Sequence, residues 1–370
     1  MKSWITTLAL LLSLTTTVVH ADEWQDWSRF KAVYMTPQGR IVDGSDKRLV
    51  TTSEGQSYAL FFALVANDRN AFDLLYNWTQ QNLAQGDLTA RLPAWLWGKT
   101  NQGYGVLDAN SASDSDLWIA YTLIEAGRIW GDDYYQNVGY LLAQRILREE
   151  TVAFGPGDRQ LLPGKQGFEL RDKVKLNPSY TPMPLLAAFA SRDTKGEWKD
   201  LYQGSLKLLT TSQAKGVSPD WLLYDGNAIS YDQQTTDIGN YNAIRSYLWA
   251  GMMPNAMDGY QPIIDSLTSF AKQSMTQGFA PLNTYAQTGR LEKKGPVGFD
   301  AALLPLLMIH SSTDVADLWA NRIRTNLVTD RNDEYYNNVL ALFGLGWYDK
   351  QYRFSDTGEL LLPWAEKGEQ

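Results

Sequence analysis

The stretch SYALFFALV, residues 57–65, is apolar nearly all the way round if it forms a helix, and AALLPLLM, residues 301–308, has the same character. By contrast, YYQNVGYLLAQRILR, residues 134–148, carries polar residues along one face. A helix that is apolar on all sides is buried, whereas an amphipathic helix packs one face inward and leaves the other in water. The alternation of the two kinds predicts two layers, with buried helices inside amphipathic ones.

Helical spacing of apolar residues extends over most of the chain. About a dozen segments show it, namely 24–34, 58–66, 71–83, 117–129, 134–146, 182–190, 198–209, 241–252, 263–271, 301–309, 315–323 and 336–345. Strand-type alternation of Val, Ile and Thr is nearly missing, which predicts an all-α chain with short β elements at most. Six helical hairpins would suit a toroid of inner helices ringed by outer ones. Four long irregular stretches, of the kind that build binding surfaces, are predicted at 99–110, 151–180, 218–240 and 284–298.

The N-terminus reads as an export signal. Met1 and Lys2 precede an apolar run over residues 5–14, and Val19-His20-Ala21 fits the small-residue rule for cleavage. The alternative is a buried N-terminal helix. We expect residues 1–21 to be a signal peptide and residues 22–370 a single domain, located in the periplasm or secreted. No later segment has the roughly 20 apolar residues needed to cross a bilayer, so no membrane insertion is expected after cleavage.

Composition narrows the chemistry. The net charge of −8 disfavours nucleic acid and anionic polymers as partners, so a neutral polymer fits better. Without Cys, and with His310 as the one histidine after the signal, the chain lacks thiolate nucleophiles, thiolate metal sites and clustered imidazole zinc centres. We therefore expect no metal and no cofactor, and a structural role for His310. Carboxylates must then do any acid or base work, and carboxylates among 14 Trp and 20 Tyr are typical of glycoside hydrolysis.

Three polar motifs precede buried helices. In TTSEGQSY, residues 51–58, Ser53 and Gln56 have capping-box spacing and put Glu54 in the first helical turn. Glu54 is either an acid that stabilises the helix dipole or a general acid, and the second role needs a pKa raised by burial or by a second carboxylate. In NSASDSDLWIA, residues 110–120, Asp114 and Asp116 are two residues apart and cannot face the same way. One is expected to meet the ligand while the other anchors structure, and simple capping is the alternative for both.

The third motif is DIGNYNAIR, residues 237–245, in which Arg245 lies one turn after Asn242 on the same helix face. Asp237 could reach that cation from the loop, and a capping loop with a surface salt bridge is the alternative. In a toroid the helix starts would share one rim, where Glu54, Asp114 and Asp237 would line a cleft. Trp95 and Trp97 are candidate sugar platforms there, with core packing as the alternative.

Together these motifs resemble glycoside hydrolase family 8, and within it the exported endoglucanases that accompany bacterial cellulose synthesis. The resemblance runs from about residue 24 to residue 364. It is carried by TTSEGQSY (51–58), RLPAWLWGK (91–99), GPVGF (295–299), and ASDSD (112–116) with Ile119, Ala120, Ala126 and Trp130. Ser115 and Thr122 depart from the usual family residues at their positions. The resemblance implies an (α/α)6 barrel, with six inner and six outer helices, that cuts β-1,4-glucan with inversion.

By the same matching, Glu54 is the general acid and Asp114 grips the sugar at the cleavage point, while Tyr180, Arg245 and Tyr336 surround the attacking water. The predicted substrate-binding set is completed by Trp95, Asp116 and Asn242. The predicted partner is a cellulose chain, with the cellulose synthase machinery as a candidate second partner. The protein is expected to be a monomer.

The chain departs from the family at the general base. Close relatives have Asp where this chain has Asn242, and an amide cannot accept the water's proton at neutral pH. Asp237, five residues upstream, is where those relatives have an apolar residue, and we expect it to be the replacement base. Two alternatives stay open. One is a non-hydrolytic glucan-binding protein that has lost its base; the other is a family 8 hydrolase acting on xylan, mixed-linkage glucan or chitosan.

Overall fold

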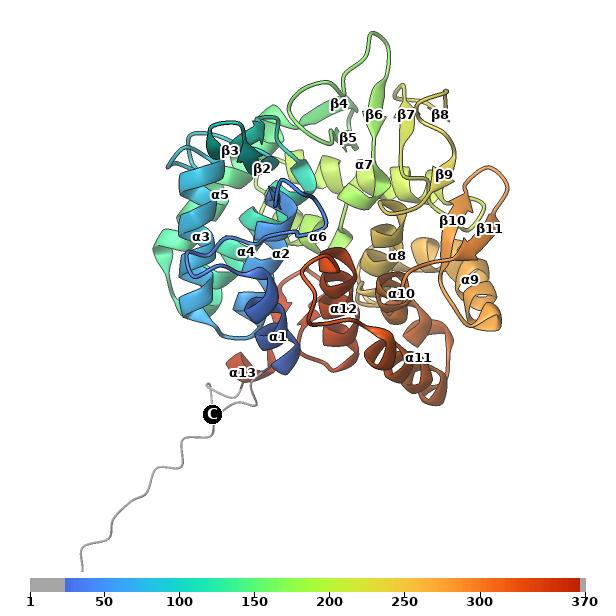
Figure 1. Cartoon of the computed structure of the whole chain (residues 1–370). Coiled ribbons are helices and arrows are strands. Elements are labelled where there is room, and N and C mark those ends of the chain that lie inside the picture. The colour runs from blue at the N-terminus through green and yellow to red at the C-terminus, as the bar shows by residue number, and fades with distance from the viewer. Residues whose placement is uncertain (1–23, 367–370) are drawn as a thin grey trace, which may run out of the picture.

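Helices alternate between an inner and an outer position within residues 24–366, which the computed structural model describes (Figure 1). The predicted signal peptide, residues 1–21, lies outside the described residues. The inner helices are α2 (Ser53–Val65), α4 (Ser113–Trp130), α6 (Met183–Ser191), α8 (Ala243–Gly251), α10 (Val297–His310) and α12 (Tyr335–Tyr348). The outer helices are α1 (Gln25–Tyr34), α3 (Arg69–Leu83), α5 (Asp133–Glu149), α7 (Glu197–Ser212), α9 (Tyr260–Gln277) and α11 (Thr313–Asn326).

Each inner helix packs against the next inner helix and against the outer helix that follows it in the chain, and α1 backs α12. This is the predicted two-layer toroid, and the expectation of an (α/α)6 barrel is confirmed. A short helix, α13 (Pro363–Glu366), and a single 3₁₀ turn, η1 (Pro178–Tyr180), lie outside the two layers. No helix in the described part of the chain is long and apolar enough to span a membrane.

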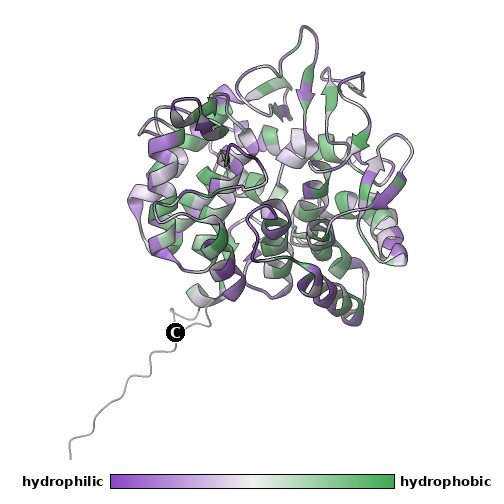
Figure 2. Ribbon diagram, in the orientation of Figure 1, coloured by the Kyte–Doolittle hydropathy of each residue, from purple (hydrophilic) through white to green (hydrophobic). Residues whose placement is uncertain are grey.

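Burial separates the two layers as the hydrophobic pattern predicts. Helix α2 buries every residue from Gly55 to Val65, whereas α5 buries one face only, through residues such as Tyr135, Leu142 and Ile146. Figure 2 shows the same contrast, with hydrophobic residues concentrated on the inner helices and hydrophilic ones on the outer surface. The inner ring is thus a helical core shielded by amphipathic helices.

Aromatic rings fill the centre of the inner ring. Phe343 of α12 lies 5.0 Å from Tyr58 of α2, 5.3 Å from Trp118 of α4 and 5.1 Å from Trp249 of α8, between ring centroids. These separations are typical of favourable edge-to-face and tilted ring pairs. The Phe343–Tyr58 contact also joins the last inner helix to the first, which closes the ring.

Close packing of α10 against α12 depends on a glycine. A Cβ atom at Gly344 of α12 would lie 1.9 Å from the backbone oxygen of Ala301 in α10. Any side chain at position 344 would therefore push the two helices apart. Only glycine at position 344 allows α10 and α12 to pack this closely.

Short strands occupy the long irregular stretches. The strands are β1 (Thr51–Thr52), β2 (Leu96–Thr100), β3 (Gly103–Asp108), β4 (Thr151–Gly155), β5 (Asp158–Leu161), β6 (Val174–Leu176), β7 (Leu222–Tyr224), β8 (Ile229–Ser230), β9 (Ile238–Gly239), β10 (Pro281–Tyr285), β11 (Arg290–Lys294), β12 (Arg353–Phe354) and β13 (Leu360–Leu361). They form the antiparallel sheets β1-β2-β3, β4-β5, β6-β7-β8, β11-β10-β9 and β12-β13. The hairpins formed by β4 to β8 lie at the top of Figure 1, and the β10–β11 hairpin lies at its right-hand side. The expectation of short β elements at most holds, and these hairpins give the long loops defined positions.

Candidate active site

Glu54 stands in the first turn of α2, at the start of a buried helix. Thr52 caps this helix, because its hydroxyl accepts a hydrogen bond from the Gly55 N–H at 3.0 Å. The predicted capping box of Ser53 and Gln56 is wrong. The Gln56 side chain bonds instead to the backbone of residues 39 and 41 and to the Thr79 hydroxyl, which ties α2 to α3 and the loop before β1.

The Glu54 carboxylate is ion-paired with Arg245, whose Nη1 lies 2.5 Å from Oε2. Burial, opposed by Arg245 and assisted by the charges of Asp114 and Asp43, raises the pKa of Glu54 to about 7. Burial therefore outweighs the cation. A carboxyl group with a pKa near neutrality can hold a proton and give it up under ordinary conditions, as a general acid must.

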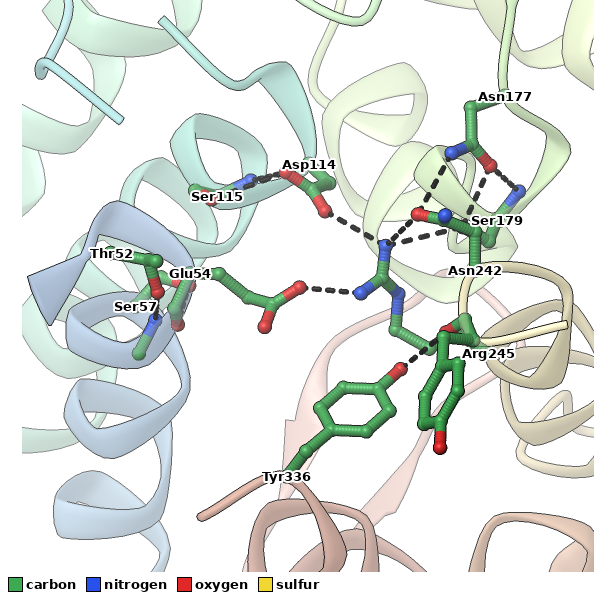
Figure 3. A network of polar contacts seen from close by, with 12 residues as sticks. Thr52, Glu54, Ser57, Asp114, Ser115, Asn177, Ser179, Asn242, Arg245 and Tyr336 are labelled. Carbon is green, nitrogen blue, oxygen red and sulfur yellow. Dashed lines mark hydrogen bonds and ion pairs between the residues drawn. The ribbon is translucent and has the colours of Figure 1, made fainter. Parts of the chain in front are cut away.

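Asp114, in the first turn of α4, lies next to the same cation. Its Oδ2 is 3.4 Å from Arg245 Nη2, while Oδ1 accepts hydrogen bonds from the Ser115 backbone N–H at 2.7 Å and the Ser115 hydroxyl at 3.1 Å. Burial raises the pKa of Asp114 as well. Two acids that are 60 positions apart in sequence thus meet at one guanidinium (Figure 3).

Arg245 is the hub of this network. We call the group formed by Glu54, Asp114, Ser179, Asn242 and Arg245 the Arg245 cluster. Arg245 lies in the first turn of α8 and is 4% exposed, and its guanidinium meets the side chains of Glu54 from α2 and Asp114 from α4. Its Nη2 also donates to the Ser179 hydroxyl and to Asn242 Oδ1, both at 3.3 Å. One cation therefore organises side chains from four separate parts of the chain.

Asn242 turns its amide oxygen toward donors. Oδ1 accepts from Arg245 and from Asn177 Nδ2 at 3.1 Å. Asn177 is itself oriented by Ser179, whose backbone N–H and hydroxyl donate to Asn177 Oδ1 at 3.0 and 2.8 Å. The side chain at position 242 thus occupies a site made for a hydrogen-bond acceptor, but it brings no ionisable group.

Two tyrosines border the cluster. The Tyr180 ring lies 5.7 Å from the Arg245 guanidinium, and the Tyr336 hydroxyl donates to the Tyr241 backbone oxygen at 2.6 Å. Burial raises the pKa of both tyrosines, so both hydroxyls stay protonated at neutral pH. The structure therefore places Tyr180 and Tyr336 beside Arg245.

Trp95 lies beside the start of α2. Its backbone oxygen accepts from the Ser53 N–H at 2.9 Å, and its side chain is near enough to Asp108 to lower the pKa of that carboxyl group. The ring is half-buried and thus partly free to meet a ligand. Trp97 differs, because it is stacked on Tyr104 at 5.2 Å and covered by the Arg40 guanidinium at 4.4 Å.

Asp116 and Asp237 do not join the cluster. Asp116 has no exposed surface and is directed toward Glu150, whose pKa burial raises to about 8. A direct contact between Asp116 and a sugar would require the N-terminus of α4 to rearrange. Asp237 is half-exposed, and its Oδ2 accepts the Gln287 N–H at 3.1 Å. Within residues 24–366, no hydrogen bond or ion pair links Asp237 to the cluster.

Sequence reasoning missed two acids near the site. Asp43, in the loop before β1, is close enough for its charge to raise the pKa of Glu54. Asp220, in the loop between α7 and β7, accepts hydrogen bonds from the first residues of α8. Neither has a local signal, since each acts on a helix that is remote in sequence. As to metals, the described residues contain no group of three or more His, Cys, Asp or Glu side chains suited to hold an ion.

Comparisons with known proteins agree on one family. The profile of "Glycosyl hydrolases family 8" matches residues 2–350. The chain is 43% identical over 369 residues to the endoglucanase of Escherichia coli (strain K12), covering 99% of this chain and 98% of that protein, and 43% identical to the endoglucanase of Salmonella typhi with the same coverage. The crystal structure of the endo-1,4-D-glucanase from Vibrio fischeri ES114 superposes with a TM-score of 0.89 at 47% identity, covering 92% of this chain and 99% of that one.

Proposed function

The chain belongs to glycosyl hydrolase family 8, and from this premise we propose that it is an endo-β-1,4-glucanase that hydrolyses cellulose with inversion of configuration. The observation that carries the proposal is the Arg245 cluster. Two carboxyl groups with raised pKa values share one guanidinium at the start of the inner helices. Such a pair suits a reaction that needs one acid to donate a proton and another polar group to hold the sugar.

In the proposed reaction Glu54 protonates the glycosidic oxygen as the bond to the anomeric carbon breaks. Its pKa of about 7 supports this role, because the acid is then protonated in a large share of molecules at neutral pH. Asp114 accepts hydrogen bonds from sugar hydroxyls at the cleavage point. Arg245 holds both carboxyl groups in place, and Tyr336 and Tyr180 lie beside the position of the attacking water.

The water also needs a base, which the Asn242 amide cannot be. The sequence predicts Asp237 as this base, because it is an acid five residues before Asn242. Its carboxylate accepts one backbone N–H, from Gln287, and has a second oxygen free for water. Inversion requires that this base act on the side of the sugar opposite Glu54.

The test is the release of reducing ends from soluble carboxymethyl cellulose, together with the fall in its viscosity. An endoglucanase lowers the viscosity early, because internal cuts shorten the polymer before much sugar is released. The Glu54→Gln variant is the matched control, since it keeps the side chain's shape and removes the proton. Proton NMR of cellopentaose digestion should show the α-anomer first, as inversion demands. Absence of reducing ends in the wild type, with retained glucan binding, would establish the base-less binding protein instead.

The same assay on xylan, mixed-linkage glucan and chitosan tests the other substrates of the family. Cellulose is the proposed substrate because the relatives that match over their full length are endoglucanases. The proposal also includes a periplasmic or secreted location, a monomeric state, and activity alongside the cellulose synthase machinery. They are tested by fractionating the producing cells, by light scattering, and by measuring cellulose output after deletion of the gene.

A further inference from the structure

Asp220 holds the N-terminus of α8 from outside that helix. Its Oδ1 accepts three backbone N–H groups, from Asn240 at 2.8 Å, Asn242 at 3.1 Å and Ala243 at 2.7 Å. Its own backbone N–H donates to the Ile238 oxygen at 2.9 Å. The Asp220 carboxylate is therefore fixed against the backbone of Asn242, the position at which an amide replaces the Asp of close relatives.

The loop that carries Asp220 also borders the Arg245 cluster. The ring of the next residue, Trp221, lies 6.2 Å from the Tyr180 ring, which in turn lies beside the Arg245 guanidinium. Burial raises the pKa of Asp220, against the lowering effects of its backbone hydrogen bonds and of Arg245. Its charge also adds to the effect of burial on the pKa of Tyr336. Asp220 is thus in electrostatic contact with two residues that surround the reacting centre.

Only one oxygen of this carboxylate is used for capping. All three N–H groups bind Oδ1, and within residues 24–366 Oδ2 has no hydrogen-bond donor. The side chain is half-buried, and Oδ2 is not closed off from solvent. A fixed carboxylate with one free, accessible oxygen is suited to accept a proton from a water molecule.

Asp237 is placed differently. Its backbone oxygen accepts the Ala286 N–H at 2.8 Å and its carboxylate accepts the Gln287 N–H, so the residue is held against the β10–β11 hairpin. Asp220, by contrast, is bonded to the start of the helix that carries Arg245. Of the two carboxylates, Asp220 has the closer structural connection to the cluster.

We propose that Asp220, rather than Asp237, is the general base of this hydrolase, an inference that rests on the proposed function. In the reaction, Asp220 Oδ2 takes a proton from water while the water oxygen bonds to the anomeric carbon. The bond from that carbon to the glycosidic oxygen breaks, and the leaving oxygen takes the Glu54 proton. Asn242 acts as a neutral spacer that holds Arg245.

The experiment compares the wild type with Asp220→Asn, Asp220→Ala and Asp237→Asn on cellopentaose. The Asp232→Asn variant is the matched control, because Asp232 also accepts backbone N–H groups, in the loop between β8 and β9, and is exposed. We expect Asp220→Asn to lower kcat by about 10² to 10⁴ with little change in KM. Asp232→Asn should retain wild-type kcat, and Asp237→Asn should lose at least tenfold less than Asp220→Asn.

Azide separates a catalytic role from a capping role. In Asp220→Ala, azide can enter the vacated space and attack without a base, so it should restore turnover and yield the α-glycosyl azide. A residue that only caps α8 would give a lower melting temperature and no azide product. Wild-type hydrolysis combined with a larger kcat loss in Asp237→Asn than in Asp220→Asn overturns this inference alone. An inactive wild type overturns the proposed function and this inference with it.

Discussion

Arg245 Nη1 and Glu54 Oε2 lie 2.5 Å apart, so the proposed acid is ion-paired with α8 before any substrate arrives. The pair opposes protonation of Glu54, yet burial outweighs it. A sugar that displaces the guanidinium from Glu54 would raise the pKa of the acid further. Substrate binding would thereby increase the fraction of Glu54 that carries the proton needed by the leaving oxygen.

Glu54→Gln removes the transferable proton and keeps the shape of the side chain. We expect kcat on cellopentaose to fall by about 10² to 10⁴, because the leaving oxygen would depart unprotonated. Binding of cellopentaose, measured by calorimetry, should persist. A variant that retains more than a tenth of wild-type kcat would move the acid to another residue, with Asp114 as the next candidate.

The pH profile should report Glu54 directly. Its pKa of about 7 predicts that kcat/KM declines as pH rises through about 7, since the acid form is then lost. Initial rates on cellopentaose between pH 5 and pH 9 measure this limb. A rate that stays level to pH 9 contradicts the assignment.

Asn242→Asp adds a third carboxylate to Arg245, beside Glu54 and Asp114, at the place where the amide oxygen now lies 3.3 Å from Nη2. The added charge competes with Glu54 for the cation and also repels the Glu54 carboxylate, so the pKa of Glu54 should rise. The alkaline limb of kcat/KM is expected to move to higher pH. A limb that stays in place, or moves to lower pH, would show that Arg245 does not couple the two positions.

Trp95→Ala tests the proposed sugar platform. The ring is half-buried beside the Glu54 helix, and ring stacking contributes about 0.5–1.5 kcal/mol in protein sites. KM for cellopentaose should rise by roughly two- to tenfold with kcat less affected, as that energy implies. Trp97→Ala is the matched control, because Trp97 already stacks on Tyr104. An equal rise in KM in both variants would argue for a packing role of the hairpin.

Glu150 should make stability depend on pH. Its pKa is raised from 4.5 to about 8, so the folded protein binds a proton that the unfolded chain releases between those values. The free energy of unfolding therefore falls as pH rises through that window. The Gln side chain of the Glu150→Gln variant does not titrate. Between pH 5 and pH 8.5 the melting temperature of this variant should therefore fall by less than that of the wild type. Parallel curves for the two proteins would count against a protonated Glu150.

Much of the fold is predictable because the hydrophobic pattern is strong. Segments such as SYALFFALV can only be buried, and the amphipathic segment at 134–148 can only lie outside. The hairpins in the long loops were not foreseen, because strands such as β7 and β9 are two or three residues long and too short to show alternation. The predicted capping box does not form, because the Gln56 side chain makes hydrogen bonds to the loop before β1 and to α3 instead.

The site is predictable only in part. Residues at the starts of buried helices, such as Glu54, Asp114 and Arg245, were found because the helices themselves were evident. Their meeting at one guanidinium depends on the closed ring, since Glu54 and Arg245 are 191 positions apart. The burial of Asp116 and the capping of α8 by Asp220 depend on side-chain directions and on loops that no local pattern specifies.

Four aromatic rings fill the middle of the barrel, those of Tyr58, Trp118, Trp249 and Phe343. A polysaccharide therefore cannot pass through the barrel and can reach Glu54 and Asp114 only at the rim where α2 and α4 begin. The filled core thus restricts binding of a glucan chain to the outside of the barrel.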